Sequence, residues 1–140
     1  MTSGRGRRIA FDYGQVRIGV AICDPDGILA TPLPHLSATH PKILQQIMSL
    51  IEEYQPITIF VGYPKKMSGE NGEAVDLVDA FINSLEPLTA IPIVTVDERL
   101  STVSAARKLR DAGKSSREAR SEIDSMAAVT ILEVGLANEN

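Results

Sequence analysis

The chain folds around two short stretches, IAFDYG at residues 9–14 and RIGVA at residues 17–21. Both are apolar, only two residues separate them, and in the second the branched aliphatic residues alternate with small ones. This pattern predicts two antiparallel strands, over 7–13 and 17–23, joined by a tight turn.

Asp12 is the single acid in these two stretches. A buried carboxylate costs free energy unless a cation or a hydrogen-bond donor meets it. Asp12 therefore either binds a ligand or satisfies a turn in which Gly14 supplies a positive φ. Gly14 and Gly19 carry no side chain, so a large ligand could approach the backbone closely there.

The rest of the chain alternates between strand and helix patterns. We expect a third strand over 28–33, a helix over 40–54, a buried strand over 57–62, a helix over 70–85, a buried strand over 91–96, a helix over 101–109 and a last helix from about 116 to 136. This order predicts an α/β fold with a mixed five-stranded sheet in the order 3-2-1-4-5 and helices on both faces.

Length and composition indicate one globular domain. The 140 residues, 44% of them hydrophobic, suffice for one core over 1–140, in which we expect residues 1–6 to be flexible. No apolar run approaches the roughly 18 residues of a membrane span, and the basic N-terminus lacks the apolar stretch of a signal peptide. We expect a cytoplasmic protein in which the lone Cys23 is half-buried and Met126 lies in the core.

The net charge of −4 argues against a protein that coats nucleic acid without specificity. The basic residues are nevertheless clustered: of the 14 Lys and Arg, seven fall between Arg99 and Arg120. This basic region is either a solvated helix face or a surface that contacts phosphates.

Three acids far apart in sequence are expected to meet. Asp12 and Glu98 each end a parallel strand, and the carboxyl ends of parallel strands share one edge of a sheet, where such folds bind ligands. Asp124 lies in the last helix at the border of its apolar face, and Ala127 and Ala128 would let this helix approach the sheet. Asp124 is about two turns inside the helix, too far for its role to be the neutralisation of the helix dipole.

Three carboxylates without His or Cys predict a hard divalent cation, Mg²⁺ or Mn²⁺. Such a site could bind a phosphodiester and activate water, and our hypothesis is two-metal hydrolysis in which Asp12 bridges the ions while Glu98 and Asp124 complete the site. The candidate nucleic-acid contacts are Gly14, Arg17, Lys65, Lys66, Arg99, Arg107, Arg110, Lys114 and Arg117.

Four motifs, in this order, closely resemble the YqgF family of pre-16S rRNA nucleases, which are also called Holliday-junction-resolvase-like proteins. They are FDYG with RIGVA at 11–21, VGYP followed by SG at 61–69, DERLST at 97–102 and IDSMAA at 123–128. The resemblance covers about residues 8–136. It implies an RNase H-like fold and a bacterial, cytoplasmic, metal-dependent endonuclease that matures the 5′ end of 16S rRNA.

The resemblance also carries the acidic positions of the family onto Asp12, Glu98 and Asp124. One position departs from the family pattern, because this chain has Val16 where the family often has a basic residue. This departure weakens the case for a substrate contact at that position and leaves the metal site unaffected.

Other functions stay open at this point. The substrate could be RNA or branched DNA, and a resolvase of four-way DNA would favour a symmetric homodimer, whereas an rRNA nuclease could be a monomer. The same fold could also serve as a non-catalytic module that binds RNA or protein. An ATPase of the actin and sugar-kinase type is disfavoured, because it needs two such domains to enclose a nucleotide.

Overall fold

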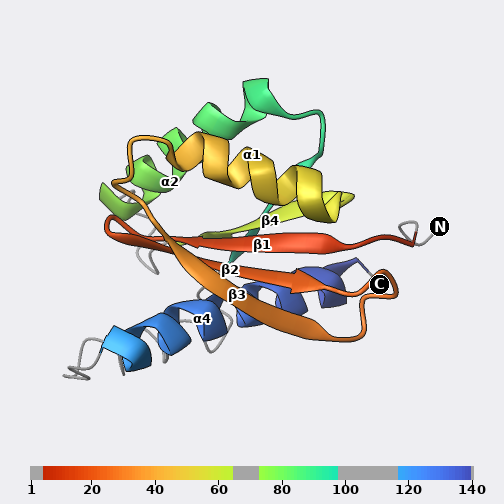
Figure 1. The fold of residues 1–140 in the computed structure, drawn as a ribbon. Helices are drawn as coiled ribbons and strands as arrows, with labels where there is room; N and C mark the ends of the chain where they lie inside the picture. Colours follow the sequence, from red (N-terminus) through yellow and green to blue (C-terminus); the bar gives the residue numbers. More distant parts are fainter. Residues whose placement is uncertain (1–4, 65–72, 98–116, 140) are drawn as a thin grey trace.

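A computed structural model describes residues 5–64, 73–97 and 117–139 of the chain. Five strands form one mixed sheet in the order β3-β2-β1-β4-β5, as the sequence predicts (Figure 1). The strands are β1 (Arg8–Tyr13), β2 (Arg17–Cys23), β3 (Ala30–Ser37), β4 (Thr58–Tyr63) and β5 (Ile93–Asp97). β1, β4 and β5 are mutually parallel, whereas β2 pairs antiparallel with β1 and with β3.

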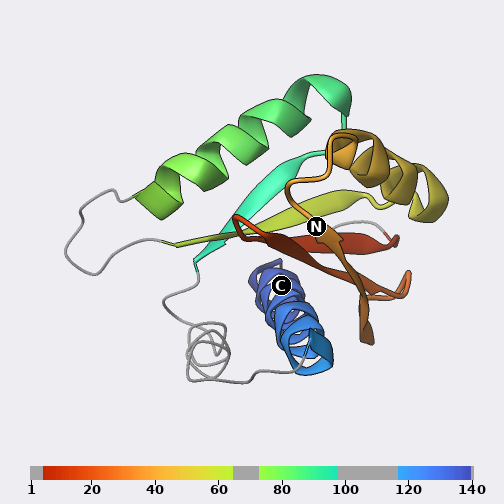
Figure 2. The same ribbon diagram turned by 60° about the vertical axis from the view of Figure 1, so that its left-hand side comes forward.

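Helices cover both faces of the sheet. They are α1 (Ile43–Tyr54), α2 (Glu73–Leu85), the short 3₁₀ helix η1 (Glu86–Leu88) and α4 (Arg117–Asn138). Among the described helices, α1 and α2 lie on one face and α4 lies on the other (Figure 2). The expected helix over 101–109 falls outside the described residues.

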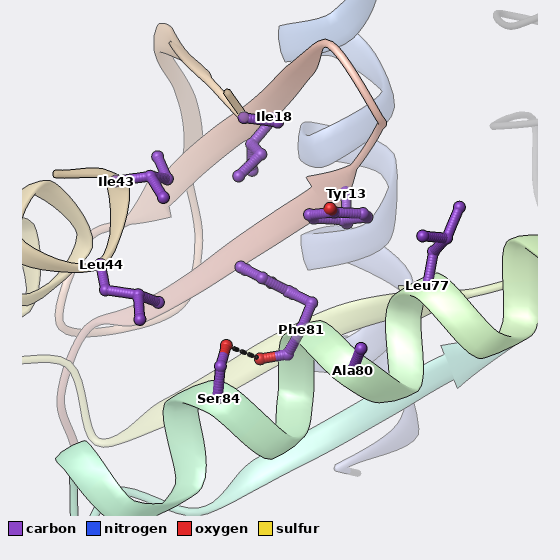
Figure 3. A pocket seen from close by; sticks show the side chains of 9 residues that line it. Tyr13, Ile18, Ile43, Leu44, Leu77, Ala80, Phe81 and Ser84 are labelled. Atoms are coloured by element: carbon purple, nitrogen blue, oxygen red, sulfur yellow. Dashed lines mark hydrogen bonds between the residues drawn. The ribbon is translucent and has the colours of Figure 1, made fainter. Parts of the chain in front are cut away.

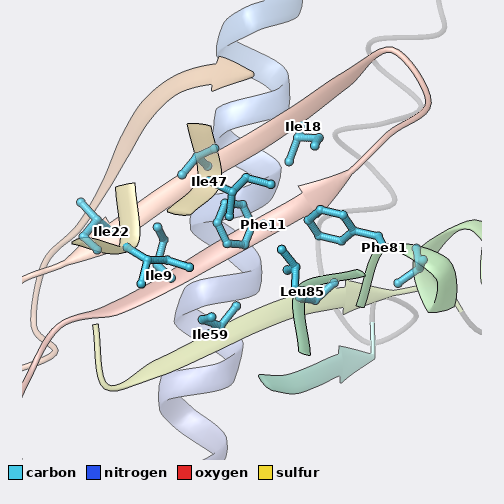
Figure 4. Packing of buried hydrophobic residues seen from close by; sticks show 12 residues of the cluster. Ile9, Phe11, Ile18, Ile22, Ile47, Ile59, Phe81 and Leu85 are labelled. Atoms are coloured by element: carbon cyan, nitrogen blue, oxygen red, sulfur yellow. The ribbon is translucent and has the colours of Figure 1, made fainter. Parts of the chain in front are cut away.

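The alternation of side chains along β1 divides the core into two clusters. Ile9 and Phe11 pack beneath α1 and α2 with side chains from both helices and from the other strands of the sheet (Figure 4). Ala10 points the other way, toward Ala127 and Ala128 of α4, and all three are fully buried. Small side chains on both sides let α4 lie close to the sheet, as predicted.

Gly135 shows how close this approach is. A Cβ atom at this position would lie 2.8 Å from the ring of Phe60 on β4, so a side chain there would push the helix off the sheet. Met126 on the same helix is 53% exposed, which contradicts its expected place in the core. Cys23 is more buried than expected, because α4 covers it and its Sγ accepts a hydrogen bond from the backbone N–H of Arg8.

The third strand runs four residues further than its predicted end. β3 reaches Ser37 and contains Pro32 and Pro34. β3 is an edge strand, and its register against β2 shifts where Pro34 stands, so the missing N–H groups are tolerated there.

The predicted start of the third strand is a turn instead. Ile28 and Leu29 donate their N–H groups to Oδ1 of Asp24, at 2.7 and 2.8 Å, and their side chains are exposed. The first helix also begins later than predicted, at Ile43, because His40 and Pro41 belong to the turns that precede it.

Candidate active site

Of the three predicted acids, Asp12 is the one whose backbone and side-chain burial the structure describes. It is the fifth residue of β1, in phase with Ala10, and therefore lies on the face that α4 covers. Only 3% of its surface is exposed. Its partner in the register of β2 is Gly19, so the residue directly opposite Asp12 carries no side chain.

The ends of the parallel strands lie together next to Asp12, as their topology requires. Phe11 pairs with Val61 on β4, and at the far end of β4 Tyr63 pairs with Asp97 on β5. Val96 is buried with the α4 cluster, so the alternation along β5 places Asp97 on the opposite face from Asp12. Glu98 follows the last residue of β5 and falls outside the described residues.

A contact at the C-terminal end of α4 shows in which direction the helix crosses the sheet. Nη2 of Arg8, at the start of β1, forms an ion pair with Oε1 of Glu139, just after α4, at 2.7 Å. Leu136 lies beside the turn at Gly27 at this same end of the sheet. α4 therefore runs antiparallel to β1, and its first half extends toward the strand ends that hold Asp12.

Asp124 belongs to that first half of α4, three and four residues before the buried Ala127 and Ala128. Its backbone is described as helix, and its side chain falls outside the described residues. Within the described part of the chain, no group of three His, Cys, Asp or Glu residues could hold a metal ion. The meeting of Asp12 with Glu98 and Asp124 thus stays a prediction.

The turn between β1 and β2 depends on Gly14, for a reason other than the one expected. Its φ is not in the positive range; among described residues only Gly27 and Gln55 have a positive φ. A Cβ at Gly14 would instead lie 2.6 Å from the carbonyl oxygen of Arg17. The absence of a side chain is what lets the chain turn back beside Asp12 and start β2 at the half-buried Arg17.

The other predicted nucleic-acid contacts fall partly or wholly outside the described residues. Arg117 opens α4, with its side chain outside the described residues. The positions that lie wholly outside the described ranges are Lys65, Lys66, Arg99, Arg107, Arg110 and Lys114.

One contact at this edge was not anticipated from the sequence. Oη of Tyr63, at the end of β4, donates a hydrogen bond to Oδ1 of Asp79 on α2 at 2.8 Å. This bond, together with partial burial, raises the pKa of the Tyr63 hydroxyl. Hydrophobic periodicity does not predict this hydrogen bond, because the bond joins a polar atom of a strand to a polar atom of a helix.

A pocket of about 250 Å³ lies on the opposite face of the sheet from Asp12 (Figure 3). Tyr13 and Ile18, a cross-strand pair of β1 and β2, line it together with Phe81 of α2. The rings of Tyr13 and Phe81 are stacked, with centroids 4.7 Å apart. The pocket is mostly apolar and is separated from the Asp12 carboxylate by the sheet itself.

Comparison with solved structures defines the fold. The chain superposes on RuvC of Thermus thermophilus in complex with a Holliday junction substrate with a TM-score of 0.56, 12% identity and coverage of 96% of this chain and 95% of that one. It superposes on Ydc2, the yeast mitochondrial Holliday junction resolvase, with a TM-score of 0.55, 11% identity and coverage of 99% and 82%. At these identities the likeness establishes the fold, which is the RNase H-like fold of the RuvC-type resolvases.

Comparison of sequences then gives the family. A model of the RuvX family, described as Holliday junction resolvase, matches residues 6–138. A relative from Streptomyces avermitilis, named "Putative pre-16S rRNA nuclease", is 44% identical over 137 residues, with coverage of 96% of this chain and 88% of the relative. One of the same name from Roseiflexus is 42% identical and covers 95% of each chain. The chain belongs to the RuvX family and is a nuclease, an enzyme of the hydrolase class.

No helix within the described ranges is long and apolar enough to cross a membrane.

Proposed function

We propose that this protein is a metal-dependent endonuclease that hydrolyses phosphodiester bonds in structured nucleic acid and that it processes the 5′ end of pre-16S rRNA in the bacterial cytoplasm. The observation that carries the proposal is the position of Asp12, a buried carboxylate at the ligand-binding edge of a RuvC-like sheet. The names of the sequence relatives support RNA as the substrate.

The described part of the site suits a hard cation. Burial of the Asp12 carboxylate is favourable only with a cation or hydrogen-bond donors near it, and a carboxylate oxygen is the ligand that Mg²⁺ and Mn²⁺ prefer. We expect Asp12, Glu98 and Asp124 to hold the ion or ions. When bound, the metal would lower the pKa of water and stabilise the developing charge on the phosphate.

The residues of the chain then have separate tasks. Asp12 presents its carboxylate from the central strand of the sheet, which has β2 on one side and β4 on the other. Because Gly19 carries no side chain, we assign the position beside this carboxylate to the phosphodiester. Arg17, with the Lys and Arg residues at positions 65, 66, 99, 107, 110, 114 and 117, would neutralise the phosphate backbone and set the register of the substrate.

Resolution of four-way DNA junctions is the second candidate function. The description of the matching family model and the RuvC-like fold favour it. Symmetric cutting of a junction needs two active sites, so this function would require a homodimer, whereas processing of a single RNA end is open to a monomer.

The two functions separate in a single assay. A 16S precursor RNA with its 5′ extension and a four-way DNA junction are each incubated with the protein in Mg²⁺ and in Mn²⁺. We expect cleavage of the RNA alone and its loss in Asp12→Asn. Asp26→Asn makes the same chemical change at an exposed acid in the β2–β3 turn, far from Asp12, and is expected to cleave like wild type.

Each alternative result has a definite meaning. Symmetric cutting of the junction without cleavage of the RNA would assign the protein to the resolvases. Cleavage of neither substrate would contradict the nuclease proposal and favour a module that binds RNA or protein. Equal cleavage by wild type and Asp12→Asn would show that the active site lies elsewhere.

A further inference from the structure

The hydrogen bond from Tyr63 to Asp79 joins the end of a strand to a helix on the far side of the sheet from Asp12. Tyr63 is the last residue of β4, and Asp79 lies in the second turn of α2, 16 residues later. Both side chains are half-buried, and the Tyr63 ring packs on the core cluster beneath α1 and α2. A hydrogen bond to a charged acceptor at 2.8 Å is among the stronger ones in proteins.

β4 lies between the other two parallel strands, β1 and β5. β1, which carries Asp12, pairs with it on one side. β5 pairs with it on the other, where Asp97 stands opposite Tyr63 and Glu98 comes next in the sequence. The last residue of β4 therefore lies between the strand end that carries Asp12 and the strand end that leads to Glu98.

We propose that Tyr63 and Asp79 are positioning residues that hold the end of β4 so that the carboxylates of the neighbouring strands keep the spacing a divalent cation needs. The inference rests on the proposed function, since it concerns the same metal site. Tyr63 does not touch the site itself, because it lies on the α2 face of the sheet and Asp12 lies on the α4 face.

The raised pKa of Tyr63 is consistent with this role, because the hydroxyl stays protonated and keeps donating throughout the neutral range. The charge of Asp79 strengthens the bond, but the geometry requires only an oxygen acceptor at this position. This difference gives a conservative variant for the test: Asp79→Asn keeps the accepting oxygen, whereas Asp79→Leu removes it.

The test measures binding of Mn²⁺ by isothermal titration calorimetry without nucleic acid, together with the Mn²⁺ concentration for half-maximal cleavage. Outer residues that orient metal ligands commonly change metal affinity by about tenfold or more. We expect Tyr63→Phe and Asp79→Leu each to raise the Kd for Mn²⁺ by about tenfold, with no further increase in the double variant. Asp79→Asn should restore most of the affinity, and saturating Mn²⁺ should restore kcat.

Ser84→Ala is the matched control. It removes a side-chain hydrogen bond within α2, from Ser84 Oγ to the carbonyl oxygen of Phe81 at 2.6 Å, without touching β4. Its affinity for Mn²⁺ should equal that of wild type. Thermal unfolding of every variant is followed in parallel, so that a general loss of stability is recognised.

The inference is overturned if Tyr63→Phe lowers the melting temperature and leaves the Kd for Mn²⁺ unchanged, or if the wild-type protein binds no Mn²⁺. Its failure differs from that of the proposed function. Wild-type protein that binds Mn²⁺ through Asp12 and cleaves neither substrate would contradict the nuclease proposal, while the binding measurements on Tyr63 and Asp79 would still decide the inference.

Discussion

Asp12 on β1 lies directly opposite Gly19 on β2, on the face of the sheet that α4 covers. The carboxylate is buried, and the residue directly opposite it on the neighbouring strand carries no side chain. Directly opposed residues in an antiparallel pair have Cβ atoms about 5 Å apart, so any side chain at position 19 would stand next to the carboxylate.

This relationship makes Gly19→Ala informative. The added methyl group would occupy space that we assign to the phosphodiester, so we expect cleavage to fall by at least about tenfold, equivalent to about 1.4 kcal/mol in the barrier. Cleavage kinetics with circular dichroism as a check of folding would measure this. Full activity in a folded Gly19→Ala protein would show that the substrate does not use this space.

Gly14→Ala tests the turn that precedes β2. A Cβ atom at this position would meet the carbonyl oxygen of Arg17 at 2.6 Å, and backbone cannot move aside as a flexible side chain can. We expect a loss of about 2 kcal/mol in the free energy of unfolding, as for an overpacked site. Urea denaturation would measure it, and a variant as stable as wild type would contradict the close approach.

The turn before β3 should be sensitive to acid through Asp24. Hydrogen bonds from Leu29 and Ile28 hold the pKa of this carboxyl below its ordinary value. A lowered pKa in the folded state stabilises the fold above the unfolded-state pKa, and this contribution is lost as the pH falls through the folded-state pKa.

Asp24→Asn keeps the accepting oxygen and removes the charge, which isolates this effect. The stability advantage of wild type over Asp24→Asn should be constant near neutral pH and should shrink toward zero as the pH is lowered into the acidic range. Melting curves of both proteins across that range would show it. An advantage that grows on acidification would contradict the direction of the pKa shift.

The ion pair of Arg8 with Glu139 should secure the end of α4. The guanidinium is only 6% exposed and the carboxylate 18%, so solvent screens this pair weakly. We expect Glu139→Ala to lower the free energy of unfolding by about 2 kcal/mol, the scale of a hydrogen bond to a charged group. Exposed Arg5 and Asp26 form the control pair, since Asp26→Ala should change stability much less. Equal effects of the two substitutions would refute a special role for Glu139.

The sequence predicts the parts of the fold in which local pattern and topology agree. β2 has the predicted bounds, and the strand order follows from the alternation of strands and helices. β3 was misplaced because the Asp24 side chain forms a turn at 28–29, and because an edge strand accommodates proline. These outcomes depend on side-chain hydrogen bonds and on the position of the strand within the sheet, which periodicity does not contain.

The candidate site, like the fold, could be predicted only in part from the sequence. The burial of Asp12 at the edge of the parallel strands could be inferred from the pattern of β1 alone. The bond between Tyr63 and Asp79 could not, because it depends on where α2 crosses the end of β4. The convergence of Asp12 with Glu98 and Asp124 stays a prediction from topology and from the family resemblance.

Thermal unfolding with and without Mn²⁺ tests the central claim most directly, because a cation that binds only the folded protein raises its melting temperature. We predict a clear rise for wild type and little or none for Asp12→Asn and for Asp124→Asn, since in our account only the folded chain gathers these carboxylates. Asp26→Asn should respond like wild type. An equal rise in wild type and Asp12→Asn would contradict the account, because the metal would then bind away from Asp12.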